Sequence, residues 1–191
     1  QVNDNHVHTK AGHRFTAKAI IVATDAPNIP LLATKKYGTY GKSALTLYFT
    51  SETKTAATQL IALNANGQQL VNNIAFMDHI SPLYAPKGQS LIAVSLKTGK
   101  NLPINELEKL VRQELLQWYP HAIQWKLLHH YAIPYALPNN ETVSYSTSAV
   151  QVSANTFICG DHLLNGSINA AMKSAEIAVS SMLSSPIFNQ Q

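Results

Sequence analysis

The chain has 191 residues, of which 46% are hydrophobic and 13% charged, and it carries a formal net charge of +4. This size allows one hydrophobic core or two small lobes. No apolar stretch approaches the length of a membrane span and the N-terminus lacks the pattern of a signal peptide, so we expect a globular, cytoplasmic protein. The basic residues are scattered along the chain, which argues against a nucleic-acid partner.

The first part of the chain, residues 1–24, predicts a two-stranded hairpin. Residues 2–9 alternate in polarity and form the first strand, and residues 10–13 favour a turn. The second strand runs from Phe15 into the apolar block at 19–23, which is typical of a strand buried on both faces. Asp25 is then a plausible cap for a short helix through Leu32.

Three histidines, His6, His8 and His13, belong to this hairpin. Three imidazoles are in principle able to hold zinc. We expect exposed histidines here rather than a metal site. The single cysteine, Cys159, excludes an internal disulfide and is expected in the core.

The middle of the chain predicts a sheet and one long helix. Apolar segments separated by turn residues predict strands at 44–49, 59–63, 70–76 and 90–96, with 64–67 as a hairpin turn. Residues 105–118 have helical periodicity and a start like a capping box. Residues 124–133 alternate as a further strand, which we expect residues 134–138 to break.

The last part of the chain predicts a strand, a turn and a helix in close succession. Residues 157–159 form an apolar run, Gly160 and Asp161 end it, and Ser167 supplies an N-cap for a helix to Leu183. The apolar residues of this helix fall on one face, so we expect it to pack. Its unpaired N-terminal amides favour an anion or a polar cofactor edge nearby.

This last segment resembles the final cofactor motif of the flavin-containing amine oxidoreductases, the group that includes protoporphyrinogen oxidases and phytoene desaturases. The matching residues are Gly160, Asp161, Gly166, Ser167, Ile168, Asn169, Ala170, Ala171, Ser174 and Ala175. Two of them, Ala170 and Ala175, stand where the family has glycine. Weaker similarity at residues 12–27 and at scattered positions in between extends the resemblance over nearly the whole chain.

The resemblance implies an FAD site. Asp161 would accept a hydrogen bond from the ribityl chain, and the backbone of Ile168 would meet the pyrimidine edge of the flavin; Gly160, Gly166 and Ser167 complete the expected cofactor-binding set. No position matches a catalytic base, so the catalytic residues stay unassigned.

Two tyrosines, Tyr131 and Tyr135, are candidates for the wall of a substrate pocket. Packing within the sheet is the alternative explanation for both. The final helix lacks the aromatic residue that small-amine oxidases place near its start, which favours a larger apolar substrate.

No Gly-x-Gly-x-x-Gly loop, which a dinucleotide needs for its pyrophosphate, occurs in the sequence. We therefore expect an α+β protein that forms the C-terminal part of an FAD-dependent oxidoreductase. A mixed or antiparallel substrate-domain sheet at 36–148 would be flanked by a strand and a helix of a Rossmann-like FAD-binding domain, at 1–35 and 149–191.

Its expected partners are a missing N-terminal FAD-domain segment, FAD and a small-molecule substrate, and alone it is expected to bind FAD weakly or not at all and to be inactive. The alternative is a free-standing binding or self-association module. An enzyme fragment predicts exposed apolar surface on residues 19–23 and 168–183, whereas a free-standing module predicts that this surface is covered.

Overall fold

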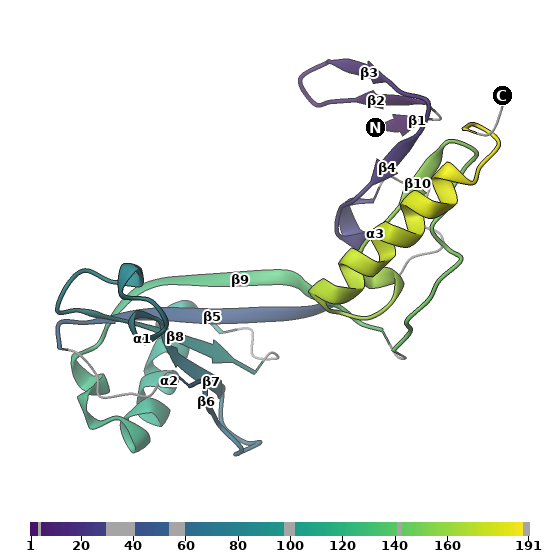
Figure 1. Cartoon of the computed structure of the whole chain (residues 1–191). Helices are drawn as coiled ribbons and strands as arrows, with labels where there is room; N and C mark the ends of the chain where they lie inside the picture. Colours follow the sequence, from purple (N-terminus) through teal and green to yellow (C-terminus); the bar gives the residue numbers. More distant parts are fainter. Residues whose placement is uncertain (4, 30–40, 54–59, 98–101, 141–142, 189–191) are drawn as a thin grey trace. The chain divides into compact units, whose positions relative to one another are not determined.

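The computed structural model describes residues 1–3, 5–29, 41–53, 60–97, 102–140 and 143–188 (Figure 1). The chain is an α+β protein that divides into two compact units. The first unit combines Gln1–Lys42 with Tyr135–Gln191, and the second is Ser43–Pro134. The expected substrate-domain range of 36–148 is therefore wider than the second unit.

The first unit begins with a small antiparallel sheet of three strands, where the sequence predicted a two-stranded hairpin. The second strand of that hairpin, expected from residue 15 through residue 23, is divided into Arg14–Thr16 and Ile20–Val22, which belong to different sheets. Its strands are β1 (Val2–Asn3), β2 (His6–His8) and β3 (Arg14–Thr16), in that order. Gly12 has a φ of 83°, a left-handed conformation that favours glycine at the turn.

A second sheet in this unit joins the two ends of the chain. β4 (Ile20–Val22) pairs in parallel with β10 (Thr156–Ile158). The helix expected from Asp25 to Leu32 is a 3-10 turn, Ala26–Asn28; residues 30–32 lie outside the described residues. The core beneath this sheet is formed by Ile20, Val22, Ala26, Ile29 and Ile158.

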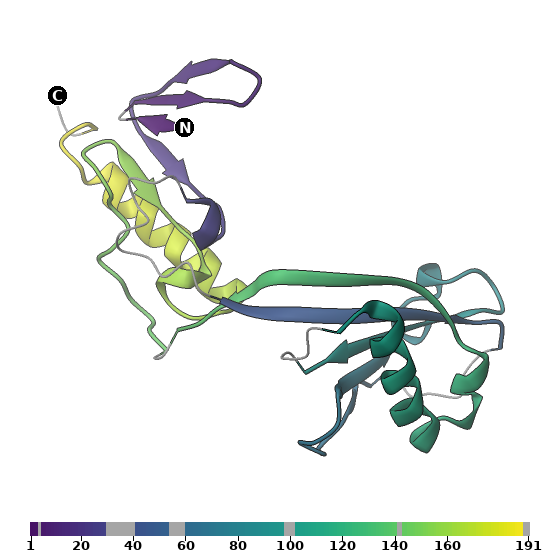
Figure 2. The same cartoon turned by 180° about the vertical axis from the view of Figure 1, so that it is seen from behind.

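The helix α3 (Ile168–Leu183) follows β10 and lies beside it in Figures 1 and 2. Ser167 is its N-cap, as predicted, and accepts a hydrogen bond from the backbone N–H of Ala170. The buried face of α3 carries small residues, namely Ala170, Ser174 and Ala178. The exposed face carries an apolar stripe of Ile168, Met172, Val179 and Leu183.

The second unit holds most of a five-stranded sheet with the order β6-β7-β8-β5-β9. The pairs β6–β7, β7–β8 and β8–β5 are antiparallel. The strands are β5 (Gly41–Ser51), β6 (Ala62–Leu63), β7 (Val71–Phe76), β8 (Ser90–Leu96) and β9 (Lys126–Pro138). Of the strand predicted at 59–63, residue 59 lies outside the described residues.

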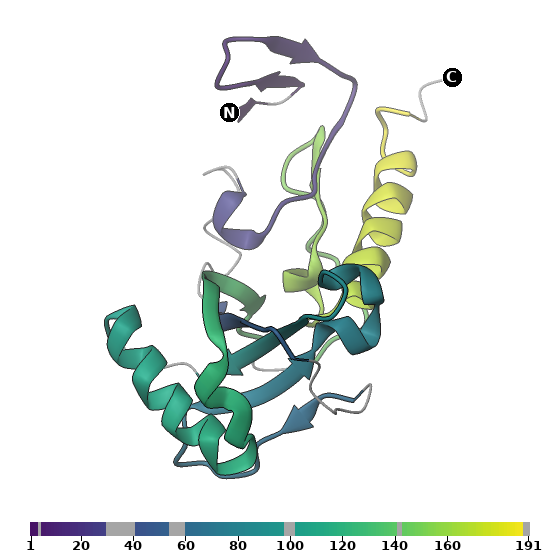
Figure 3. The same cartoon turned by 90° about the vertical axis from the view of Figure 1, so that its left-hand side faces the viewer.

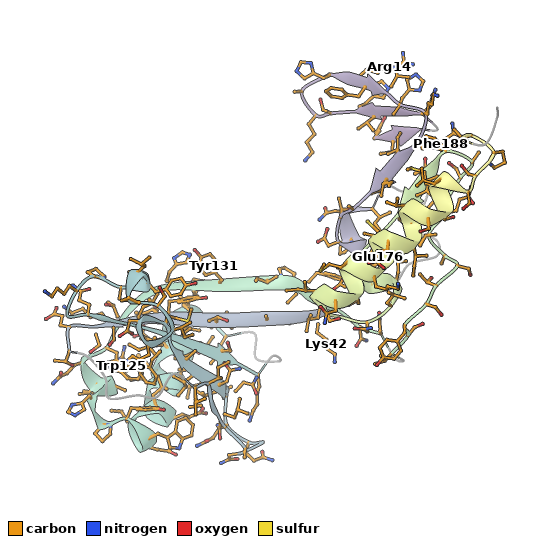
Figure 4. All side chains as sticks on the ribbon, viewed as in Figure 1. Arg14, Lys42, Trp125, Tyr131, Glu176 and Phe188 are labelled. Atoms are coloured by element: carbon orange, nitrogen blue, oxygen red, sulfur yellow. The ribbon has the colours of Figure 1, made fainter. Side chains whose placement is uncertain are left out.

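One face of this sheet is covered by α2 (Ile104–Trp118) (Figure 3). Leu107, Val111 and Leu115 of the helix are buried in one cluster with the sheet side chains. Trp125, which follows the 3-10 helix Pro120–Gln124, completes this core (Figure 4). The remaining short helices are α1 (Met77–Ile80) and the 3-10 helix Pro82–Tyr84.

Two sequence predictions in this unit are wrong. β9 does not break at residues 134–138 but runs to Pro138, because it is the last strand in the sheet order, where a missing proline N–H removes no interior ladder bond. The start of α2 is not a capping box at Asn105. Its N-cap is Pro103, whose carbonyl accepts from the N–H groups of Glu106 and Leu107.

Two side chains of α2 fasten it to its surroundings. The Glu114 carboxylate accepts hydrogen bonds from the N–H groups of Leu70 and Val71, at 2.7 and 2.8 Å. The Arg112 guanidinium donates to the carbonyls of Ala122 and Trp125, at 2.6 and 2.9 Å. None of the helices in the described part of the chain is both long and apolar enough to span a membrane.

Candidate functional site

The candidate site lies where the two parallel strands of the first unit end. In the register of β4 and β10, Val22 is paired with Ile158. Asp25 and Asp161 each lie three residues beyond these partners. The carboxyl ends of neighbouring parallel strands meet at one edge, and this edge is where open α/β sheets commonly bind ligands.

A pocket of about 460 Å³ occupies this edge. Both aspartates line it, and α3 supplies an apolar wall on another side. The lining residues are Ala23, Thr24, Asp25, Cys159, Gly160, Asp161, Ala171, Met172 and Ala175. All of them belong to the first unit.

The turn at Gly160 is held from behind by α3. The backbone N–H of Gly160 donates to the Ser174 hydroxyl at 2.8 Å, and that hydroxyl donates to the carbonyl of Ala171 at 2.7 Å. Ser174 has no exposed surface. A side chain at position 160 would collide with the imidazole of His162, so glycine is required by close packing. These contacts fix the backbone just before Asp161.

The charge state of His162 follows from its surroundings. Burial lowers the pKa of this imidazole, and the nearby carboxylates of Asp161 and Asp25 oppose that shift only partly. His162 therefore favours the neutral form.

The start of α3 is formed by the other expected cofactor residues. Ser167 accepts from Ala170 N–H at 3.1 Å and donates to the Asn165 side chain at 2.7 Å. A side chain at Gly166 would crowd Pro138. The backbone N–H groups of Ile168 and Asn169 have no hydrogen-bond partner among the described residues, as the first turn of a helix requires.

The structure therefore separates the five expected cofactor residues into two groups. Gly160 and Asp161 line the pocket, whereas Gly166, Ser167 and Ile168 form the helix start and are not among its lining residues. The Ile168 side chain is 80% exposed. Sequence reasoning missed Asp25 as a pocket residue. Its position opposite Asp161 depends on the strand register, which the sequence does not reveal.

The two alanines that replace family glycines occupy different environments. Ala170 is buried on the inner face of α3, so its methyl group packs inside the unit. Ala175 is half-buried and lines the pocket. Only the second substitution therefore narrows the space open to a ligand.

The two tyrosine candidates belong to different units, and neither lines this pocket. Tyr135 packs against the core beneath β4, and its ring lies close to Gly41. Its hydroxyl is buried and has no hydrogen-bond partner among the described residues. Burial raises the pKa of Tyr135, and Asp161 and Asp25 add to the rise.

Tyr131, on β9 of the second unit, is 57% exposed (Figure 4). Its ring contacts Tyr48 edge-on, with centroids 5.8 Å apart, and it also contacts His129. The described residues hold no group of three or more potential metal ligands.

A model of the flavin containing amine oxidoreductase family matches residues 1–183. The chain belongs to this family. The resemblance that the sequence predicted is thereby confirmed, and the family implies a flavin cofactor.

Solved structures share the fold at low sequence identity. A protein from Exiguobacterium, provisionally named a protoporphyrinogen oxidase, has a TM-score of 0.68 and 14% identity over 95% of this chain and 45% of its own. A Pyrococcus furiosus protein has a TM-score of 0.64 and 10% identity, over 97% of this chain and 46% of its own.

An oxidoreductase from Methanosarcina mazei has a TM-score of 0.62 and 10% identity, over 93% of this chain and 48% of its own. The chain thus spans about half the length of the solved structures it matches. No curated protein matched the sequence.

Proposed function

We propose that this chain is the part of an FAD-dependent oxidoreductase that supplies the substrate domain and one side of the flavin site. In this proposal residues 1–35 and 149–191 belong to the FAD-binding domain and residues 36–148 to the substrate domain. The observation that carries it is the pocket at the ends of β4 and β10, in a chain that the family model matches over residues 1–183.

The residues at this edge suit the flavin end of FAD. Asp161 offers a half-buried carboxylate that accepts no side-chain or backbone hydrogen bond from the described residues. At the start of α3, outside the residues that line the pocket, the free amides of Ile168 and Asn169 offer donors and a positive partial charge. When bound, FAD would supply a ring that accepts a hydride from a C–H group of an amine or a larger apolar substrate; the adjacent C–N or C–C bond becomes a double bond and a proton is released.

The ADP end of FAD needs residues that this sequence lacks, because no Gly-x-Gly-x-x-Gly loop is present. We therefore propose that a separate glycine-rich strand-turn-helix segment completes a Rossmann-like domain. The far edge of β4 pairs with no other described strand, and parallel sheets rarely consist of two strands alone. A third strand at that edge is the addition we propose.

Part of the apolar surface that we expect to contact the glycine-rich segment is exposed, and part of it is buried. The apolar stripe of α3 is exposed, as an enzyme fragment predicts. The strand at 19–23, which an enzyme fragment also predicts to be exposed, is largely buried. Ile20 and Val22 are each only 8% exposed, because they pack on the core of their own unit. The helix stripe and the strand edge, rather than the strand faces, are thus the proposed contact.

Expression with and without the coding sequence that precedes residue 1 tests this proposal. We expect the extended protein to purify with flavin, seen as visible absorption, and the 191-residue chain to bind FAD weakly or not at all and to be inactive. Submicromolar FAD affinity of the 191-residue chain, or an extended protein without flavin, contradicts the proposal.

Self-association is the second candidate function, and the exposed stripe of Ile168, Met172, Val179 and Leu183 favours it. Light scattering separates the two. A stable dimer of the 191-residue chain that Met172→Glu dissociates, in a protein that binds no flavin when extended, supports self-association. A monomer supports the enzyme.

A further inference from the structure

Asp25 lines the pocket, although the resemblance assigns it no role there. We propose that Asp25 is a second ligand-binding residue, which together with Asp161 accepts hydrogen bonds from an uncharged polyol chain and repels phosphate. This inference rests on the proposed flavin site and deepens it, because it names the part of the ligand that the pocket selects.

The strand register brings the two carboxylates to equivalent places. Asp25 follows β4 by the same number of residues as Asp161 follows β10, and the two strands are paired in parallel. Both aspartates line the same pocket. Both also raise the pKa of the Tyr135 phenol, which places the two negative charges near one buried group. The two carboxylates therefore act on one ligand.

Their hydrogen-bonding capacity is largely unused. Asp25 accepts from the Asn28 side chain through Oδ1, at 2.6 Å, which orients its carboxylate. Its Oδ2 and both oxygens of Asp161 accept no hydrogen bond from any described residue. An ionised carboxylate is only an acceptor, so the ligand has to bring donors. Neighbouring hydroxyl groups of a polyol supply donors at the spacing of adjacent carbons.

The charge of the pocket determines which ligand groups it excludes. None of its nine lining residues is a lysine, arginine or histidine. A phosphate placed here would meet two negative charges and no lining cation, whereas a neutral polyol carries no charge for the aspartates to repel. The wall of Ala171, Met172 and Ala175 suits the apolar part of the same ligand. A flavin has both an uncharged polyol, the ribityl chain, and a largely apolar ring. We therefore expect these two parts, and not the phosphates of FAD, to occupy the pocket.

Three flavins that differ in their side chain test this inference on the 191-residue chain, with weak affinities measured by ligand-observed NMR. Lumiflavin has the ring alone, riboflavin adds the polyol, and FMN adds a phosphate. In Asp25→Asn we expect the riboflavin affinity to fall about tenfold, since a charged hydrogen-bond acceptor becomes neutral. The lumiflavin affinity should stay unchanged, and the affinity of FMN relative to riboflavin should rise.

Two further variants keep the test decisive. Glu176→Gln removes one negative charge from an exposed site on α3 and should leave all three affinities as in the wild type (Figure 4). Asp25→Glu keeps the charge but moves the carboxylate, so riboflavin should weaken while phosphate stays disfavoured. A circular dichroism spectrum like that of the wild type verifies that each variant is folded.

The inference is overturned if the wild-type chain does not bind riboflavin, if Asp25→Asn leaves riboflavin affinity unchanged, or if it weakens lumiflavin equally. These outcomes differ from the failure of the proposed function, which is an extended protein without FAD. Suppose that the extended protein contains FAD but the Asp25→Asn variant binds riboflavin as the wild type does. The proposed function would then be supported, and the role of Asp25 in ligand binding would be contradicted.

Discussion

Ser174 shows how one buried hydroxyl can set the geometry of a turn. It accepts from Gly160 and donates to Ala171, so a strand end and a helix are joined through a single atom. The sequence predicted that Ser167 caps α3, because a cap bonds to residues of its own helix. It did not predict Ser174, because its partner lies fourteen residues away and on another element.

Replacement of Ser174 by alanine should destabilise the first unit. The part-buried Gly160 N–H would lose its partner, which costs about 1–3 kcal/mol of unfolding free energy. Urea denaturation measures this. Ser180→Ala, at an exposed position on the same helix, is the matched control and should stay within about 0.5 kcal/mol of wild type. Equal stability of the two variants would mean that the Gly160 bond contributes nothing.

His162 should make stability depend on pH. Burial is the main cause that lowers its pKa below the usual 6.5. As the pH falls below 6.5, the unfolded chain takes up a proton that the folded chain resists, so the unfolding free energy decreases. Above 6.5 the contribution is fully present.

Denaturation at pH 7.5 and 5.5 measures this effect. His162→Gln cannot titrate, so it should lose less stability over this interval than the wild type does. His130→Gln, at an exposed position, should retain the wild-type dependence. A His162→Gln variant whose stability falls as steeply as that of the wild type would contradict the assignment.

At the scale of elements, hydrophobic periodicity predicted α2, α3 and most strands. In α2 the repeat marks the buried face, whereas in α3 it marks a stripe that is exposed and the buried face carries small residues. Details that depend on neighbours were not predictable. The prolines of β9 are tolerated because of the strand's place at the sheet edge, and sheet order is a property of the whole fold. Likewise, Asp25 became a pocket residue only once β4 and β10 were paired.

Glu114 links α2 to the start of β7, a contact that the sequence does not predict, and Glu114→Gln should weaken this link. Its carboxylate accepts two backbone N–H groups at the start of β7. Glutamine keeps the shape but offers one oxygen in place of two, so we expect a loss of about 1–2 kcal/mol. Chemical denaturation tests this, with exposed Glu106→Gln in the same helix as the control. Equal effects of both substitutions would argue against the link.

At the scale of the molecule, the α+β class was predictable from the alternation of strand and helix patterns. The bounds of the units were not, since they follow from contacts between distant residues. Each unit has cores drawn only from its own residues. Leu47, Phe49 and Trp125 are in the core of the second unit, and Ile20 and Ile158 are in the first.

Separate cores predict separate responses to substitution. Ser174→Ala should speed amide hydrogen exchange in β4 and β10 and leave β7 and β8 as in the wild type. Glu114→Gln should do the reverse. Mass spectrometry of peptides after exchange measures both. Faster exchange throughout the chain in either variant would show that the two units open together.

The parallel pairing of β4 with β10 also constrains the order of events on the ribosome. The second unit is continuous in sequence, whereas the first needs both of its segments. At roughly 5–20 residues per second, β4 waits on the order of ten seconds for its partner strand to be synthesised. During that interval Ile20, Ile21 and Val22 lack β10, so the nascent chain exposes an apolar strand edge that a chaperone is suited to bind.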